Sequence, residues 1–207
     1  MNIITLDLKF GKLLPRSNTN RVVIHHSASA DVSSVEIHRW HLQRGWSGIG
    51  YHLVIREDGT IEQGRPLNTV GAHAGSEGNS DSIAVCLTGD FTRQPPAIKQ
   101  MKSLVELIGW LKELYSFDLE VVRHCDLAAT QCPGNLLPWS ELQQALGSHI
   151  AWKEELMNRA LSVGLMMDRH QADEPAPKWF VAALVLNLLD LITVNENRKD
   201  DNHEKES

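Results

Sequence analysis

The chain has 207 residues, enough to bury a sizeable core and to form one main domain with a small appendage. Hydrophobic residues make up 42% of it, a proportion typical of a globular protein. The formal net charge of −6 argues against a nucleic-acid partner, although it leaves room for a local groove that binds another polymer.

The first third of the chain predicts three strands and one helix. A run of β-branched residues predicts a buried first strand, and the capping-box pattern of Ser33 and Glu36 predicts the start of a helix. An Asp58-Gly59 turn between two short apolar runs predicts a hairpin. In chain order we expect a strand at 21–25, a helix at 33–43, and strands at 51–55 and 60–63.

The middle of the chain continues this alternation. Residues 71–81 are rich in Gly, Ser and Asn and predict a loop, whereas the apolar run 82–88 predicts a central strand. Apolar residues at helical spacing predict a long helix over 97–115. A strand at 119–122 and a helix at 138–146 follow. The sequence therefore predicts an α/β fold, with a central mixed β-sheet flanked by helices.

From residue 151 the pattern becomes helical. Two helices are predicted, at 152–163 and 177–194, and they would form a C-terminal helical hairpin appendage. The second contains an apolar run at 179–186 that is too short and too soon interrupted by polar residues to span a bilayer, so we expect no transmembrane segment. Residues 197–207 are polar and charged and predict a disordered tail.

The cysteines and the N-terminus indicate where the chain is made. Cys86, Cys125 and Cys132 do not form a paired framework, which favours folding in a reducing compartment. Residues 1–21 contain no long apolar stretch after a basic start, so we expect no ordinary signal peptide. Synthesis in the cytoplasm is the expectation.

Two histidines and a cysteine could form an open metal site. His25 ends the first predicted strand, His124 ends the last one, and Cys132 follows in a loop. Nitrogen, nitrogen and sulfur are ligands that zinc accepts, and three protein ligands leave a fourth position for water. Such a site is typical of a hydrolase. The spacing of His124 and Cys132 alone does not identify it, and His38 and His41 are expected to be structural.

Six short motifs carry the strongest functional signal. They are IHHSAS at 24–29, GWSGIGYH at 45–52, EDGTIEQGR at 57–65, VGAHAG at 70–75, NSDSIAVCLTGDF at 79–91 and RHCDLAATQCPG at 123–134. In this order and at this spacing they resemble the type 2 N-acetylmuramoyl-L-alanine amidases, the family of T7-type lysozymes and catalytic peptidoglycan recognition proteins. The resemblance covers about residues 20–147.

The resemblance implies a zinc site and two catalytic hydroxyls. It makes His25, His124 and Cys132 the zinc ligands and Tyr51 the catalytic tyrosine. Thr130 stands where the T7-type enzymes have lysine and where animal recognition-protein amidases commonly have threonine. It is therefore expected to act in catalysis, with less weight than the ligands because a cation is lost.

Four further residues flank these positions. Trp46 and His73 lie in loops that are expected to border the cleft, so we assign both to substrate binding. The alternative for Trp46 is packing against the sheet. His26 and His52 each adjoin a functional residue, and because neighbours in a strand point to opposite faces, they are expected to be structural.

The implied activity is hydrolysis of the amide bond between N-acetylmuramic acid and L-alanine in peptidoglycan. A phage or prophage endolysin is the expected setting, made in the cytoplasm and reaching the cell wall after holin-type release. The alternatives are a non-catalytic peptidoglycan-binding module and a cytosolic muropeptide-recycling amidase. Recycling amidases of the superfamily have aspartate at the position of Cys132, and non-catalytic recognition proteins typically lack this cysteine. Cys132 therefore favours the wall-cleaving branch.

The expected organisation has three parts. The C-terminal part either binds the wall, forms a homo-oligomer or packs on the amidase. The predicted boundaries are a zinc amidase domain at 1–150, a helical C-terminal domain at 151–196 and a disordered tail at 197–207.

Overall fold

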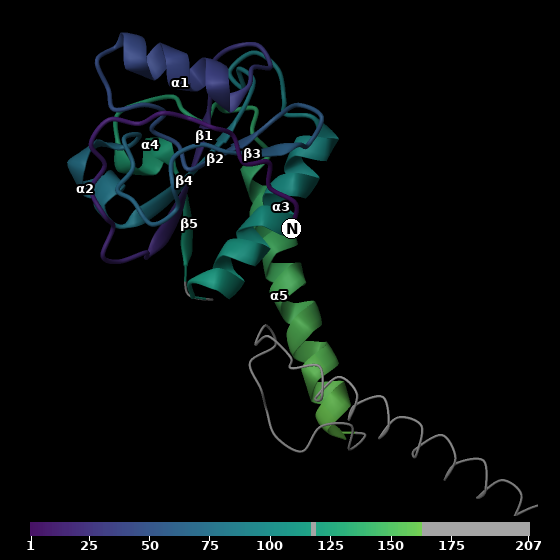
Figure 1. The fold of residues 1–207 in the computed structure, drawn as a ribbon. Helices are drawn as coiled ribbons and strands as arrows, with labels where there is room; N and C mark the ends of the chain where they lie inside the picture. Colours follow the sequence, from purple (N-terminus) through teal and green to yellow (C-terminus); the bar gives the residue numbers. More distant parts are fainter. Residues whose placement is uncertain (117–118, 163–207) are drawn as a thin grey trace, which may run out of the picture. The chain divides into compact units, whose positions relative to one another are not determined.

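A mixed five-stranded β-sheet forms the centre of the computed structural model (Figure 1). The structure describes residues 1–116 and 119–162. The strand order is β3-β2-β4-β1-β5, with β2 and β3 antiparallel and the other pairs parallel. The strands are β1 (Arg21–His26), β2 (Leu53–Ile55), β3 (Ile61–Gln63), β4 (Ser82–Leu87) and β5 (Glu120–Arg123). The predicted mixed α/β sheet is confirmed.

Helices cover both faces of this sheet. On one face, α3 (Ile98–Leu114) and the first turns of α5 (Trp139–Ser162) pack on the largest apolar cluster. On the other face lies α1 (Ser34–Gln43), whose Ile37 packs with Val54 of β2. The short helices α2 (Gly75–Ser80) and α4 (His124–Leu127) border the second face, where Ala74 before α2 and Leu127 of α4 pack in one cluster with Val23 and Val122.

The alternation along β1 decides which face receives His25. Val22 and Ile24 belong to the cluster under α3, whereas Val23 packs with Ala74 and Val122 on the opposite side. Because side chains alternate along a strand, His25 shares the face of Val23. His25 is therefore kept out of the apolar cluster that α3 covers.

Apart from one-residue shifts at other element ends, four features differ from the prediction: the start of β2, the helices α2 and α4, and the continuity of α5. β2 begins at Leu53, so Tyr51 precedes the strand, and its carbonyl accepts a hydrogen bond from the Arg65 N–H at 2.8 Å. Residues 75–80 form α2 where a loop was predicted. The predicted helices at 138–146 and 152–163 are one continuous helix, α5. A glycine inside a helix costs only about 1 kcal/mol, so Gly147 does not end it.

Part of the prediction for the C-terminal region lies outside the described residues. This applies to the helix expected at 177–194 and to the tail at 197–207. The chain divides into two units after Leu146. Within the described residues, no helix combines the length and the apolar character needed to cross a membrane.

A network around Asp31 fixes the loop that leaves β1. The Asp31 carboxylate accepts hydrogen bonds from Arg56 Nε at 2.9 Å and Nη2 at 2.8 Å, from the Glu57 N–H at 3.1 Å and from the Thr88 hydroxyl at 2.5 Å. Arg56 also pairs with Glu62 at 3.1 Å. The loop after His26 is thus tied to the ends of β2 and β4.

Asp31→Asn should lower the free energy of unfolding at pH 7 by about 1–2 kcal/mol, since hydrogen bonds to a charged group are lost from a partly exposed site. The pKa of Asp31 is held far below its ordinary value, chiefly by hydrogen bonds from Arg56. Its stabilising effect is therefore fully present above pH ~4 and is lost as the pH falls below that value. Denaturant unfolding of both proteins between pH 7 and pH 2.5 should show the curves converging.

The matched control is Asp7→Asn, because Asp7 is an exposed carboxylate whose ion pair with Lys9 lies at the surface. It should leave stability unchanged at both ends of the pH range. Equal stability of Asp31→Asn and the parent at pH 7 would contradict the role given to the network.

Candidate metal centre

His25 and His124 are brought together by the register of two parallel strands. Ile24 of β1 lies opposite Arg123, the last residue of β5, and each is followed by a histidine. His124 was predicted to end the strand but is the first residue of α4. The two rings have their centroids 4.5 Å apart. His25 is buried and His124 is half-buried. The two residues predicted to be ligands therefore lie side by side, and their role as ligands stays a prediction.

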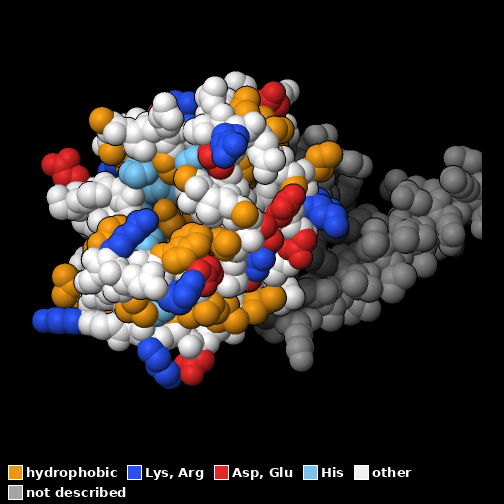
Figure 2. All heavy atoms as spheres, turned by 90° about the horizontal axis from the view of Figure 1, so that it is seen from above, with side chains coloured by type: hydrophobic (Ala, Val, Ile, Leu, Met, Phe, Trp, Pro, Cys, Tyr) orange, Lys and Arg blue, Asp and Glu red, His pale blue; other side chains and the backbone are white. Residues whose placement is uncertain are grey.

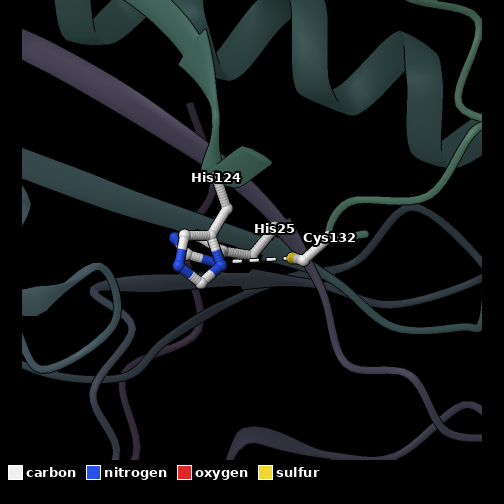
Figure 3. A group of neighbouring side chains, drawn as sticks. All are labelled: His25, His124 and Cys132. Carbon is white, nitrogen blue, oxygen red and sulfur yellow. Dashed lines mark hydrogen bonds between the residues drawn. The ribbon is translucent and has the colours of Figure 1, made fainter. Parts of the chain in front are cut away.

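Cys132 reaches the same point from the loop after α4. Its carbonyl accepts a hydrogen bond from the Cys125 N–H at 2.8 Å, and its sulfur accepts one from the His26 N–H at 3.4 Å. The Cys132 Sγ atom lies 3.6 Å from His25 Nδ1 (Figure 3). Backbone contacts with both histidine-bearing segments therefore fix the thiol.

The dimensions of the group fit a tetrahedral metal site. One ligand atom from each of His25, His124 and Cys132 lies within 4.8 Å of the others (Figure 3). Zinc–nitrogen bonds of about 2.0–2.1 Å and zinc–sulfur bonds of about 2.3 Å, at a tetrahedral angle, separate nitrogen and sulfur by about 3.6 Å. In the part of the chain that the structure describes, no other group of three or more such side chains meets this distance criterion.

Burial sets the protonation of the three candidate ligands. It lowers the pKa of His25 well below the ordinary value, assisted by the neighbouring His124, whose own pKa is lowered by burial. Both imidazoles are therefore neutral at pH 7 and have a lone pair to offer. Burial raises the pKa of the Cys132 thiol to about 12, against the opposing hydrogen bond from His26. A bound cation would reverse this effect, because a coordinating thiol is deprotonated.

Tyr51 stands beside the candidate ligands. Its ring centroid lies 5.1 Å from that of His25 and 5.6 Å from that of His41. Burial, with Cys86 and Cys132 nearby, raises the pKa of the phenol well above its ordinary value. The hydroxyl therefore keeps its proton at neutral pH and can donate a hydrogen bond.

Thr130 is exposed and belongs to the loop that carries Cys132. Its hydroxyl oxygen accepts a hydrogen bond from the Cys132 N–H at 3.2 Å. A hydroxyl can accept and donate at once, so its own hydrogen remains available. The geometry is compatible with the catalytic role predicted for Thr130, which stays a prediction.

The two residues assigned to substrate reach this group through different neighbours, His41 for Trp46 and His25 for His73. Trp46 is 41% exposed and its ring packs on His41 with centroids 4.6 Å apart, so it extends the row formed by His41 and Tyr51. His73 is half-buried, and its Nδ1 atom lies 2.9 Å from His25 Nε2. Figure 2 shows histidine side chains reaching the surface together on one face, beside hydrophobic side chains. Substrate contact by either residue stays a prediction.

The histidines expected to be structural are satisfied within the fold. His26 accepts a hydrogen bond from the Phe91 N–H at 3.1 Å, and His52 accepts one from the Ala84 N–H at 2.9 Å. His38 and His41 accept from the backbone of the 45–50 loop, at the N–H groups of Ile49 and Gly50. These predictions are confirmed. The contact between His73 and His25 was not predicted, because the spacing of the two residues gives no sign of it.

Comparisons with known proteins agree with this geometry. Residues 15–135 match the family model described as N-acetylmuramoyl-L-alanine amidase. The endolysin of Klebsiella phage KP32 is 37% identical over 142 residues, which cover 64% of this chain and 93% of the relative. The endolysin of Escherichia phage T7 is 37% identical over 145 residues, covering 64% and 93%.

A solved structure shows the same similarity in three dimensions. The N-acetylmuramoyl-L-alanine amidase LysC from Clostridium intestinale URNW is 36% identical, with a TM-score of 0.68. The similarity covers 71% of this chain and 98% of LysC.

His41→Asn should reduce the loss of stability in mild acid. Burial, with the charges of Arg44 and Arg65, lowers the pKa of His41 to about 4. An unfolded histidine titrates near pH 6.5, so the unfolded chain binds more protons and the free energy of unfolding falls as the pH drops from 6.5 to 4. Asparagine can still accept from the Gly50 N–H without becoming charged. The fall over this window should be smaller by about 2–3 kcal/mol.

Denaturant unfolding at a series of pH values measures this difference, and NMR titration locates the pKa of His41. Parallel curves for the variant and the parent would show that His41 does not titrate as its burial demands.

Proposed function

The chain belongs to the N-acetylmuramoyl-L-alanine amidase family, and we propose that it is a zinc-dependent phage or prophage endolysin. The bond cleaved is the amide between N-acetylmuramic acid and the L-alanine of the peptidoglycan stem. The convergence of His25, His124 and Cys132 at the ends of β1, β5 and the following loop carries this proposal. The endolysin relatives support the setting.

Zinc is the metal that the donor set favours. His25 and His124 would supply neutral nitrogen, and Cys132 would supply sulfur. When bound in such a site, zinc activates water near neutral pH and polarises the carbonyl of the scissile amide. The burial that keeps both imidazoles neutral leaves them ready to bind, because a protonated histidine cannot be a ligand.

Two hydroxyls would stabilise the charge that develops on the amide oxygen. A tyrosine phenol is protonated at neutral pH and burial raises the pKa of Tyr51 further, so it can donate, and Thr130 also has its hydroxyl hydrogen available. A well-placed donor of this kind is typically worth about 10²–10³ in rate. The departing amino group of L-alanine also needs a proton before it can leave.

The substrate would lie at the carboxyl ends of the parallel strands β1 and β4. A cavity of about 470 Å³ borders the residues that follow β1 and β4 and is lined by Ala28, Ser29, Ala30, Asp90, Arg93 and Gln94. Trp46 offers an exposed aromatic face beside the row of His41 and Tyr51, and we assign it to contact with the muramoyl peptide.

The wider setting follows from the proposed activity. The protein would act on the cell wall after holin-type release from the cytoplasm. The amidase domain would span residues 1–150, and the part at 151–196 would bind the wall or join copies of the chain.

Digestion of purified sacculi should release free stem peptides that begin with L-alanine, identified by mass spectrometry. A chelator should abolish the release and added zinc should restore it, because the proposed ligands have no substitute. His124→Ala should be inactive. Soluble anhydro-muropeptides, tested in parallel, should be poorer substrates than sacculi.

Three other results would contradict the proposed activity. Cleavage within the glycan strand would refute the amidase assignment. Binding to sacculi without release of peptide would indicate a recognition module, and a preference for anhydro-muropeptides would indicate a recycling enzyme.

Tyr51→Phe should lower kcat by about 10²–10³ while leaving zinc affinity unchanged, since the ring that contacts His25 and His41 is kept and only the donor is lost. Thr130→Val should lower kcat by a smaller factor, and Thr130→Ser should retain most of the activity. Steady-state kinetics on a soluble muramoyl-peptide substrate, with metal content measured in parallel, tests both. Full activity of Tyr51→Phe would remove the phenol from the mechanism.

A further inference from the structure

We propose that His73 is a positioning residue that fixes the tautomer and orientation of His25, so that His25 presents Nδ1 to the metal. The inference rests on the metal site of the proposed function. His73 Nδ1 lies 2.9 Å from His25 Nε2, and the two rings are nearly perpendicular, at 88°. The contact is made on the side of the His25 ring away from Nδ1, the atom that lies 3.6 Å from Cys132 Sγ.

The serine Ser82 sets the direction of the hydrogen bonds that run from His25 through His73. The Ser82 hydroxyl donates its single hydrogen to the carbonyl of Gly78. Towards His73 Nε2, which lies 3.3 Å away, the Ser82 oxygen can therefore only accept. His73 must carry its hydrogen on Nε2, which leaves Nδ1 as a bare acceptor.

The same logic passes from His73 to His25. Because His73 Nδ1 can only accept, His25 Nε2 must be the donor in the 2.9 Å contact. An imidazole that donates from Nε2 and binds a metal must have no hydrogen on Nδ1, and this is the atom that faces Cys132 Sγ at 3.6 Å. The chain of contacts thus selects the tautomer that can bind a metal through Nδ1.

The position of His73 is itself fixed by the fold. Its N–H and that of Ala74 donate to the Asn79 side-chain oxygen at 2.8 and 2.9 Å. A Cβ at Gly71 would lie 2.4 Å from His73 Cδ2 and 2.6 Å from Nε2, so the ring occupies space that only glycine leaves open. Ser82 is fully buried at the start of β4.

This role replaces the substrate contact expected for His73 from the sequence. Both ring nitrogens are engaged within the protein, one by His25 and one by Ser82. Neither is left to hydrogen-bond a muramoyl peptide.

Zinc affinity of His73 variants tests the proposal, measured by competition with a chromophoric chelator at pH 7. His73→Ala should weaken zinc binding by about 10–100-fold, the usual cost of losing a partner behind a metal-binding histidine. His73→Asn should recover most of the affinity, because its amide oxygen can accept from His25 Nε2. The matched control is His38→Ala. It also removes a buried histidine, but one whose Nδ1 accepts a hydrogen bond from the Ile49 N–H and not from His25. It should keep the parent affinity even where it lowers stability.

A second measurement needs no substitution. Histidine ¹⁵N NMR of the metal-free parent should show hydrogen on Nε2 and none on Nδ1 in both His25 and His73. Hydrogen on Nδ1 of His25, or parent-like zinc affinity of a folded His73→Ala, would overturn the proposal. A parent that binds no zinc would instead refute the proposed function, while the NMR result would still decide the tautomer.

Discussion

The parallel pairing of β1 with β5 is the constraint on which the site depends. The pairing places Ile24 opposite Arg123, so that His25 and His124 leave the sheet side by side although they are distant in sequence. β1 is also hydrogen-bonded to β4 on its other side, so its register is fixed twice. A slip of one residue would move His25 to the face covered by α3, because the side chains of a strand alternate. The hydrophobic residues of β1 therefore specify the position of a candidate metal ligand, His25, as well as the core.

Burial is used at this site in two opposite ways. For His25 and His124 it lowers the pKa and keeps the imidazoles neutral, which suits a metal ligand. For Cys132 it raises the pKa of the thiol, which disfavours the thiolate until a cation arrives. Burial also raises the pKa of the Tyr51 phenol, which stays protonated and can donate a hydrogen bond. Burial alone thus gives the imidazoles and the phenol the protonation states that an amidase needs, whereas the Cys132 thiolate would depend on the bound cation.

Buried histidines also serve as hydrogen-bond partners for irregular backbone near the site. His38 and His41 accept from consecutive N–H groups of the loop that leads into Tyr51. His52 accepts from the Ala84 N–H and so joins the residue after Tyr51 to β4. A loop without regular ladder bonds still has to pair its buried N–H groups, and neutral imidazoles do this here. The high histidine content therefore reflects the construction of the site more than its chemistry.

The sequence by itself determined the sheet, the long helix α3, the three candidate ligands that the fold brings together, and the structural roles of His26 and His52. Strand alternation and apolar periodicity are local signals, and the ordered motifs from 24–29 to 123–134 identify the family. Only the tertiary structure decided the beginning of β2, the helix α2 and the continuity of α5. It alone revealed that His73 stands behind His25, since this contact depends on the Asn79 and Gly71 packing that places a distant loop against β1. Contacts between residues far apart in sequence depend on how elements pack, and no periodicity records them.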